Sequence, residues 1–106
     1  METAGYAGPV PIRDIAYIEV ALNTCNVYMA GGARHSVRKA LAEFEAELPP
    51  FSFAKPHKSY LVNFEFILRA LKCENEIELA GFRQKIPISR RNKKEFWEHY
   101  RKYMRS

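Results

Sequence analysis

The chain has 106 residues and a mass of 12.3 kDa, which is enough for one small domain and too little for a second independent core. Its composition, 47% hydrophobic and 27% charged, is that of a folded soluble domain and not of a disordered chain. No apolar run approaches the ~20 residues that span a bilayer, and the first residues lack the features of a secretory signal. We therefore expect a cytoplasmic protein with no membrane partner.

Positive charge is concentrated towards the carboxyl terminus. Residues 83–105 contain nine Lys and Arg and two Glu, a net charge of +7, whereas residues 1–82 carry −2. A basic end on a neutral-to-acidic body is typical of a protein that binds a polyanion. It is equally typical of a solvated helix face that only keeps the protein in solution.

The first half of the chain predicts a hairpin and a helix. Residues 1–8 are expected to be a flexible lead-in or a cloning remnant, and residues 9–106 a single domain. Apolar alternation over residues 15–30 fits two strands that turn at Asn23–Thr24. Three pairs would then share one face: Leu22 with Cys25, Val20 with Val27, and Ile18 with Met29. A helix is expected from Ser36, as its N-cap, to Leu48, because apolar residues recur at helical intervals (Val37, Leu41, Phe44, Leu48).

The second half predicts short strands and a second helix. A strand is expected over residues 51–55, ended by Pro56, and a mostly extended segment over residues 64–71. A hairpin turning at Ala80–Gly81 would place Glu78 opposite Arg83 and Glu76 opposite Lys85. The last helix would start at Ser89 and turn an aromatic stripe (Phe96, Tyr100, Tyr103) to the core and basic side chains to solvent. The predicted fold class is β-rich α+β, with several hairpins and two helices.

No group of residues indicates catalysis. The sequence contains neither a G-x-S-x-G elbow nor a glycine-rich phosphate loop, and Asp14 is its only aspartate. Cys25 and Cys73 match no metal or redox spacing, and the histidines are scattered. We therefore expect no enzyme, no cofactor and no metal.

Three motifs lie along the chain in the order and at the spacing of one family pattern. Residues 53–63, FAKPHKSYLVN, resemble an aromatic, a basic residue and then H-R-S-Y-L-V-N. Residues 14–19, DIAYIE, resemble a D-I-x-Y-I-E strand, and residues 86–91, IPISRR, resemble an I-P-V-S-R signature. Together these motifs resemble those of the LytTR-type DNA-binding domains of bacterial transcriptional regulators, and the resemblance covers residues 12 to about 100.

The resemblance implies an elongated arrangement of small antiparallel sheets that binds double-stranded promoter DNA. It implies recognition of tandem direct repeats, often by a dimer, through loops that enter successive major grooves. It also implies regulation by an N-terminal phosphoacceptor receiver domain of a two-component system, which this chain does not include.

The resemblance assigns DNA contacts to three segments of this chain. The first is Asn23, Thr24, Cys25 and Asn26, where a basic residue common in relatives is missing. The second is His57, Lys58 and Ser59, and the third is Ser89, Arg90, Arg91 and Asn92 together with Lys94. Arg91 is the expected base reader and Arg90 or Lys94 the phosphate contact, since an arginine can bind guanine bidentately. His57 would instead be structural if its ring bonds to the backbone.

Two other functions stay open at this point. One is a protein-interaction module that uses hairpin edges or the aromatic stripe. The other is a module for single-stranded nucleic acid, which would need exposed aromatic rings. Cys25 could make DNA binding sensitive to oxidation, or it could be a small buried hydrophobe at the end of a strand.

Overall fold

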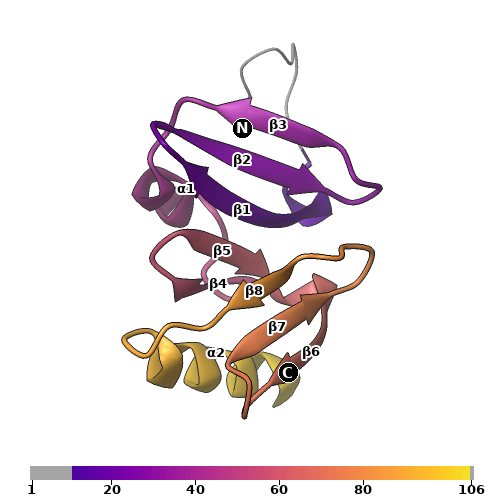
Figure 1. Ribbon diagram of the computed structural model, residues 1–106, viewed down its shortest axis with the longest axis vertical. Coiled ribbons are helices and arrows are strands. Elements are labelled where there is room, and N and C mark those ends of the chain that lie inside the picture. The colour runs from indigo at the N-terminus through magenta and orange to yellow at the C-terminus, as the bar shows by residue number, and fades with distance from the viewer. Residues whose placement is uncertain (1–10, 106) are drawn as a thin grey trace.

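The computed structural model describes residues 11–105 and contains two antiparallel sheets and two α-helices (Figure 1). The first sheet has the strand order β3-β2-β1-β5-β4. Its strands are β1 (Ile15–Ala21), β2 (Thr24–Met29), β3 (Arg34–Val37), β4 (Phe53–His57) and β5 (Tyr60–Asn63). The second sheet, in the order β6-β7-β8, consists of β6 (Ile67–Leu71), β7 (Glu76–Leu79) and β8 (Lys85–Pro87).

Helices complete the elongated molecule, which measures 40 × 27 × 26 Å. The helices are α1 (Leu41–Glu47) and α2 (Lys93–Arg105), with short 3-10 turns η1 (Ile12–Asp14) and η2 (Phe64–Phe66). The predicted β-rich α+β fold with small antiparallel sheets is confirmed. The predicted lead-in over residues 1–8 lies outside the described residues, so its boundary with a domain over residues 9–106 stays a prediction.

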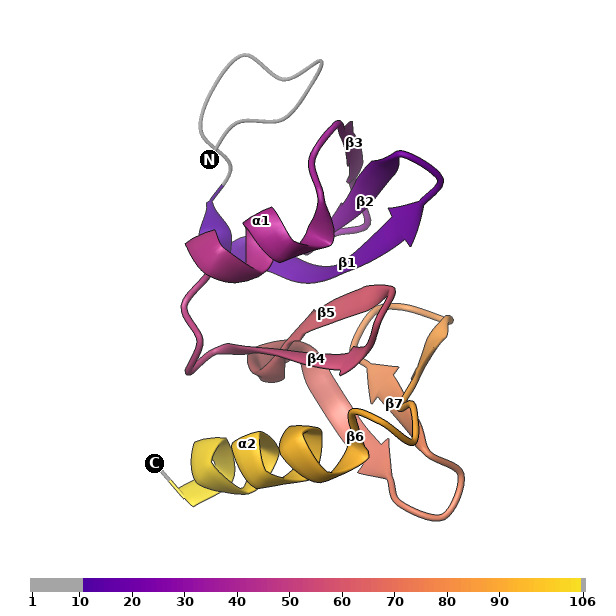
Figure 2. The same cartoon turned by 90° about the vertical axis from the view of Figure 1, so that its left-hand side faces the viewer.

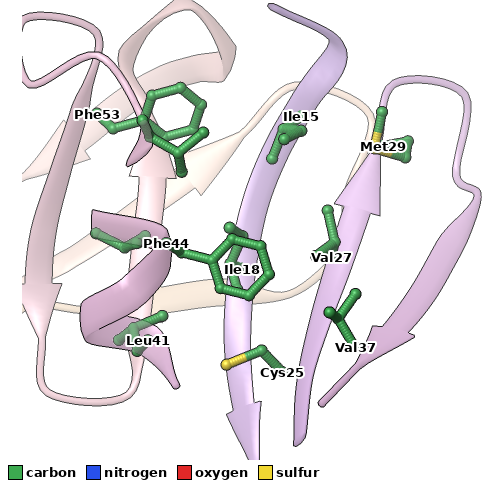
Figure 3. Close-up of a cluster of buried hydrophobic side chains, with 11 residues drawn as sticks. Ile15, Ile18, Cys25, Val27, Met29, Val37, Leu41, Phe44 and Phe53 are labelled. Atoms are coloured by element: carbon green, nitrogen blue, oxygen red, sulfur yellow. The ribbon is translucent and has the colours of Figure 1, made fainter. Parts of the chain in front are cut away.

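The first sheet is covered on both faces because apolar residues point to each side of it. On one face Phe44 projects from α1 towards Ile18 of β1, and both side chains are fully buried (Figure 3). Burying a side chain of this size stabilises the fold by roughly 1.5–3 kcal/mol. The other face packs against the second sheet and against α2, which lies along β4 (Figure 2).

The aromatic stripe of α2 belongs to this second core, as predicted. Phe96 is buried, and the ring of Phe64 lies 5.0 Å from that of Tyr103 and 5.7 Å from that of Tyr100, centroid to centroid. Burial raises the pKa of the Tyr100 hydroxyl. These rings therefore hold α2 against the body of the protein, with Phe96 buried and Tyr100 and Tyr103 partly buried.

The register of the first hairpin differs from the prediction by two residues. Ala21 pairs with Thr24 and Val20 with Cys25, so the turn consists of Leu22 and Asn23. The Thr24 hydroxyl donates a hydrogen bond of 3.0 Å to the Ala21 carbonyl and closes this turn. Because a shift of two residues leaves every side chain on the same face, the apolar pattern alone could not distinguish the two registers.

The predicted helix over residues 36–48 is wrong in its first turn. Residues Arg34–Val37 form β3, in which Val37 pairs with Cys25 and is buried in the first core. The helix begins at Leu41, where the Glu43 carboxylate accepts a hydrogen bond of 3.3 Å from the Ala40 N–H. Val37 would be buried by either structure, so its helical spacing was not informative.

The predicted end of the next strand at Pro56 is also wrong, because β4 continues through Pro56 to His57. β4 is an edge strand of the first sheet. A proline is tolerated there because no neighbouring strand needs its missing N–H.

The second hairpin has a longer connection than predicted. Glu78 pairs with Lys85 and Ile77 with Ile86, which leaves residues 80–84 between the strands. The Lys85 ammonium lies 3.6 Å from one Glu78 oxygen, and the Arg69 guanidinium bonds the other. These cations hold the pKa of the Glu78 carboxyl below its usual value, mainly through the hydrogen bond from Arg69.

Asn63 is a buried polar residue that links the end of β5 to the start of β1. Its side-chain amide donates a hydrogen bond of 2.9 Å to the Ile15 carbonyl, and its side-chain oxygen accepts one of 3.0 Å from the Glu65 N–H. It therefore bonds to backbone, as expected for a residue of the core.

We predict that Asn63→Ala destabilises the protein by about 1–3 kcal/mol, because the Ile15 carbonyl and the Glu65 N–H both lose a partner. Urea unfolding followed by circular dichroism would measure this loss. Asn23→Ala, at an exposed position, is the matched control and should leave the free energy of unfolding within about 0.5 kcal/mol of the wild type. Equal free energies of unfolding for the two variants would show that the hydrogen bonds of the Asn63 side chain do not stabilise the fold.

Candidate nucleic-acid interface

Three connections lie one above another along one side of the molecule, the left-hand side in Figure 1. They are the β1–β2 turn at Leu22–Asn23, the β4–β5 turn at Lys58–Ser59, and residues 88–92 between β8 and α2. We call this side the three-turn edge. It brings together the three segments that the sequence motifs single out, although they are far apart in the chain.

Hydrogen bonds to the β4–β5 hairpin join the three connections. The Val20 N–H, close to the first turn, donates to the Ser59 carbonyl over 2.9 Å. On the other side of the hairpin the Ser89 N–H donates to the Pro56 carbonyl over 2.8 Å. The Asn92 side-chain amide donates to the Lys55 carbonyl over 3.1 Å. The middle turn is therefore held from both sides.

A polar cluster next to the middle turn reinforces the pairing of β1 with β5. The Tyr60 hydroxyl donates to the Glu19 carboxylate over 2.8 Å and accepts from the Gln84 amide over 3.0 Å. Burial, and then the bond to Glu19, raise the pKa of Tyr60 to about 12, so the hydroxyl stays protonated and donates at neutral pH. Gln84 also ties the β7–β8 connection to the first sheet.

At the middle turn His57 and Lys58 have different roles. The His57 Nδ1 atom accepts a hydrogen bond of 3.1 Å from the Ser59 N–H, so the ring fixes the turn. This geometry favours the structural alternative for His57. Lys58 is exposed, and it forms no ion pair within residues 11–105.

The third connection is a capped turn and not the first turn of the helix. The Ser89 hydroxyl accepts from the Asn92 N–H over 3.2 Å and donates to the Asn92 side-chain oxygen over 2.7 Å. The prediction that α2 starts at Ser89 is therefore wrong, since the helix begins at Lys93. Arg90, Arg91 and Lys94 are exposed, and in the described part of the chain none of the three is paired with a carboxylate.

At the first turn, the four residues that the resemblance assigns to DNA contact differ in their exposure and in their hydrogen bonds. Asn23 is exposed, and its side chain has no hydrogen-bond partner among the described residues. Thr24 bonds to Ala21, and the Asn26 side-chain oxygen accepts from the Ser36 hydroxyl over 2.9 Å.

Cys25 is a correction to the predicted DNA contacts. Its side chain is 1% exposed and lies in the first core beside α1 (Figure 3), so it offers almost no surface to a ligand. The same burial raises the pKa of its thiol and leaves little reactive thiolate, which argues against an oxidation-sensitive role.

The structure adds a basic residue that the first loop lacks in sequence. A cleft of about 660 Å³ lies between the first turn and the start of α1, and Arg38 lines it together with Leu22 and Asn23. Arg38 is exposed and without an ion pair in the described chain, whereas the Lys39 ammonium pairs with Glu47. Arg38 falls within the helix that was expected over residues 36–48, and no sequence pattern indicated that it lies beside the first turn.

Positive charge continues from the third connection along α2. A groove of about 430 Å³ is lined by Lys72, from the β6–β7 connection, and by the side chains of Arg90, Lys93, Lys94, Trp97, Glu98 and Arg101. Glu98 is the one carboxylate among these lining residues. The groove therefore extends the positive potential of the third connection, and the half-buried Trp97 is the one aromatic residue in its lining.

Two other kinds of site are absent from the described residues. No cluster of three or more His, Cys, Asp or Glu side chains is placed to hold a metal ion within residues 11–105. In the same range, no helix has the length and apolar character needed to cross a membrane.

Both the sequence and the fold of the chain match known proteins. The family model described as the LytTr DNA-binding domain matches residues 8–101. Among solved structures, the chain is similar to the LytTr DNA-binding domain of a protein described as a methyl-accepting/DNA response regulator from Bacillus cereus. The TM-score is 0.79 at 23% sequence identity, over 92% of this chain and 91% of that one, and it shows the shared fold. No curated protein matched the sequence. Because the family model spans most of the sequence, the chain belongs to the LytTr DNA-binding domain family.

Proposed function

We propose that this protein binds double-stranded promoter DNA sequence-specifically through the three-turn edge, with no catalytic step and no cofactor. The observation that carries the proposal is the placement of exposed, unpaired polar side chains from three separate connections along one side. Asn23, Lys58 and Arg91 each come from a different connection.

The dimensions of the molecule support binding along a duplex. Its long axis of 40 Å runs in the direction in which the three connections are stacked and is comparable with one turn of B-DNA, about 34 Å (Figure 1). Turns distributed along such an edge can enter successive grooves of one duplex. Two copies on tandem direct repeats, under the control of a receiver domain in the cytoplasm of a bacterium, would form the regulatory complex.

The side chains divide into those that read bases and those that bind phosphates. Arg91 is the base reader, because a guanidinium can donate two hydrogen bonds to the O6 and N7 atoms of guanine. Exposed cations on or beside the connections serve the phosphates. They are Arg38 in the cleft next to the first turn, Lys58 on the second connection, Arg90 on the third, and Lys94 at the start of α2. His57, Ser89 and Asn92 use their polar atoms within the protein, so they position these contacts.

Selection of bound duplexes from a random pool, followed by gel shifts, tests the proposal. We expect the selected duplexes to contain a repeated motif, and excess single-stranded DNA of the same sequence should not displace the protein. Enrichment of no duplex motif would refute the proposal. Competition by the single strand would favour a single-stranded nucleic-acid module, and binding to neither form would favour a protein-interaction module.

Arg91→Ala should weaken binding to the selected duplex by about 1–3 kcal/mol and relax the preference at one base pair. Gel shifts with duplexes mutated at each position of the repeat would measure both effects. Arg13→Ala is the control, because Arg13 is exposed in η1 at the opposite end of β1 from the first turn. An Arg91→Ala variant that discriminates among duplexes as well as the wild type would show that another residue reads the base.

Lys94→Ala should weaken binding to all duplexes alike, because a phosphate contact carries no sequence information. With about four phosphate contacts, log K should fall against log salt with a slope of roughly −4 for the wild type, and about one unit less steeply for this variant. Titrations at several salt concentrations would measure the slopes. Lys102→Ala, which removes an exposed cation near the other end of α2, should leave the slope unchanged.

Asn92→Ala should lower both stability and affinity, because the third connection loses its bond to β4. We expect a loss of about 1 kcal/mol in the free energy of unfolding and weaker binding to every duplex with the base preference retained. Urea unfolding and gel shifts would separate these effects. Loss of preference at a single base pair, with stability unchanged, would instead make Asn92 a direct contact.

A further inference from the structure

Leu22 stands at the tip of the first hairpin in a conformation that is unfavourable for leucine. Its φ angle is +56°, in the left-handed region, and its relative exposure is 101%. Asn75, with a φ of +54°, is the one other non-glycine residue of the described chain with positive φ. Asparagine tolerates this region, whereas a leucine side chain there crowds the backbone.

Neither exposure nor strain at this position benefits the free protein. The first central position of a two-residue hairpin turn with positive φ favours glycine or asparagine. A fully exposed leucine contributes no packing that could offset the strain. Strained residues of this kind are concentrated at functional sites, where a ligand contact is gained.

The surroundings of Leu22 define the chemistry of that ligand. The exposed amide of Asn23 is its neighbour in the turn, and both residues lie on the three-turn edge with Lys58 and Arg91. In the major groove an A·T pair presents the N6 and N7 atoms of adenine next to the apolar 5-methyl group of thymine. Asparagine binds the first and an aliphatic side chain contacts the second.

We propose that Leu22 packs against the 5-methyl group of a thymine in the major groove and, with Asn23, makes the first turn a reader of A·T pairs. This inference rests on the proposed function and adds a specificity contact to it.

Other exposed apolar side chains of the described chain do not share this setting. Leu68, the second residue of β6, is 64% exposed, Met104 near the end of α2 is 66% exposed, and Phe51 between α1 and β4 is 55% exposed. None of the three has a positive φ, and none is in one of the three connections. Leu68 is therefore a suitable control position.

The test removes one methyl group at a time from the DNA. Each thymine of a duplex selected with the wild-type protein is replaced by deoxyuridine, which lacks only the 5-methyl group, and affinities are measured by gel shift. One replacement should weaken wild-type binding about threefold to fivefold, the loss expected from exposing one buried methyl group. Leu22→Gly should bind the thymine duplex that much more weakly and be insensitive to the same replacement.

Two further variants control for indirect effects. Leu22→Met retains an aliphatic side chain and should remain sensitive to the replacement, and so should Leu68→Thr. Without DNA, Leu22→Gly should unfold at a temperature equal to or higher than that of the wild type, because glycine adopts positive φ without strain. A lower unfolding temperature would contradict a strained Leu22.

The outcomes distinguish this inference from the proposed function. If the wild type binds a selected duplex but no deoxyuridine replacement weakens it, or if Leu22→Gly keeps the same sensitivity, the thymine contact is refuted and duplex binding still stands. If Leu22→Gly loses affinity for thymine and deoxyuridine duplexes equally, Leu22 acts as a wedge between base pairs, and the methyl contact is again refuted. Failure of the wild type to bind any duplex would refute the proposed function itself.

Discussion

The β4–β5 hairpin is held from both sides by backbone hydrogen bonds, and the arrangement of the candidate interface depends on them. The Ser59 carbonyl accepts from Val20 in the neighbouring strand, and the Pro56 carbonyl accepts from Ser89 ahead of α2. Main-chain bonds of this kind fix distances more tightly than contacts between long side chains do. Three connections remote in sequence thereby form one surface, and the aromatic packing of α2 on Phe64 keeps the third in place.

The charges of the protein are arranged so that the three-turn edge remains uncompensated. The ion pairs formed by the described residues join Lys39 with Glu47, and Arg69 and Lys85 with Glu78. The cations of the edge have no such partner, so their field extends into solvent over about a Debye length, ~10 Å at 0.1 M salt. Binding to a polyanion then releases counterions instead of breaking internal ion pairs. The same residues contribute little to the stability of the free domain.

Many polar side chains around the interface are already bonded within the protein. Thr24 closes the first turn, His57 fixes the second, and the Ser89–Asn92 pair caps the third. Each of these residues belongs to a segment that the family resemblance links to DNA. A motif identifies such a segment as a whole, because a residue that shapes a turn is as necessary to the segment as one that reaches the ligand. The hydrogen bonds separate the two kinds of residue.

Much of this protein could be read from its sequence. Apolar alternation indicated the buried face of β2, the stripe on α2 indicated core packing, and the charge count located the basic end. These properties are local, since they follow from which residue types recur at a given spacing. The motifs around residues 14–19, 53–63 and 86–91 identified the family that the comparisons then showed.

Tertiary structure decided what depends on partners distant in the chain. Both hairpin registers were shifted by two residues, a change that leaves the buried faces unaltered, so only the turn geometry could select between them. Val37 joined a strand instead of a helix because β2 offered it a pairing partner, and this exposed Arg38 beside the first turn. The same choice of register placed Leu22 at the tip of the first hairpin. Periodicity specifies which side of an element is apolar, whereas the residue that occupies a turn is fixed by long-range hydrogen bonding and packing.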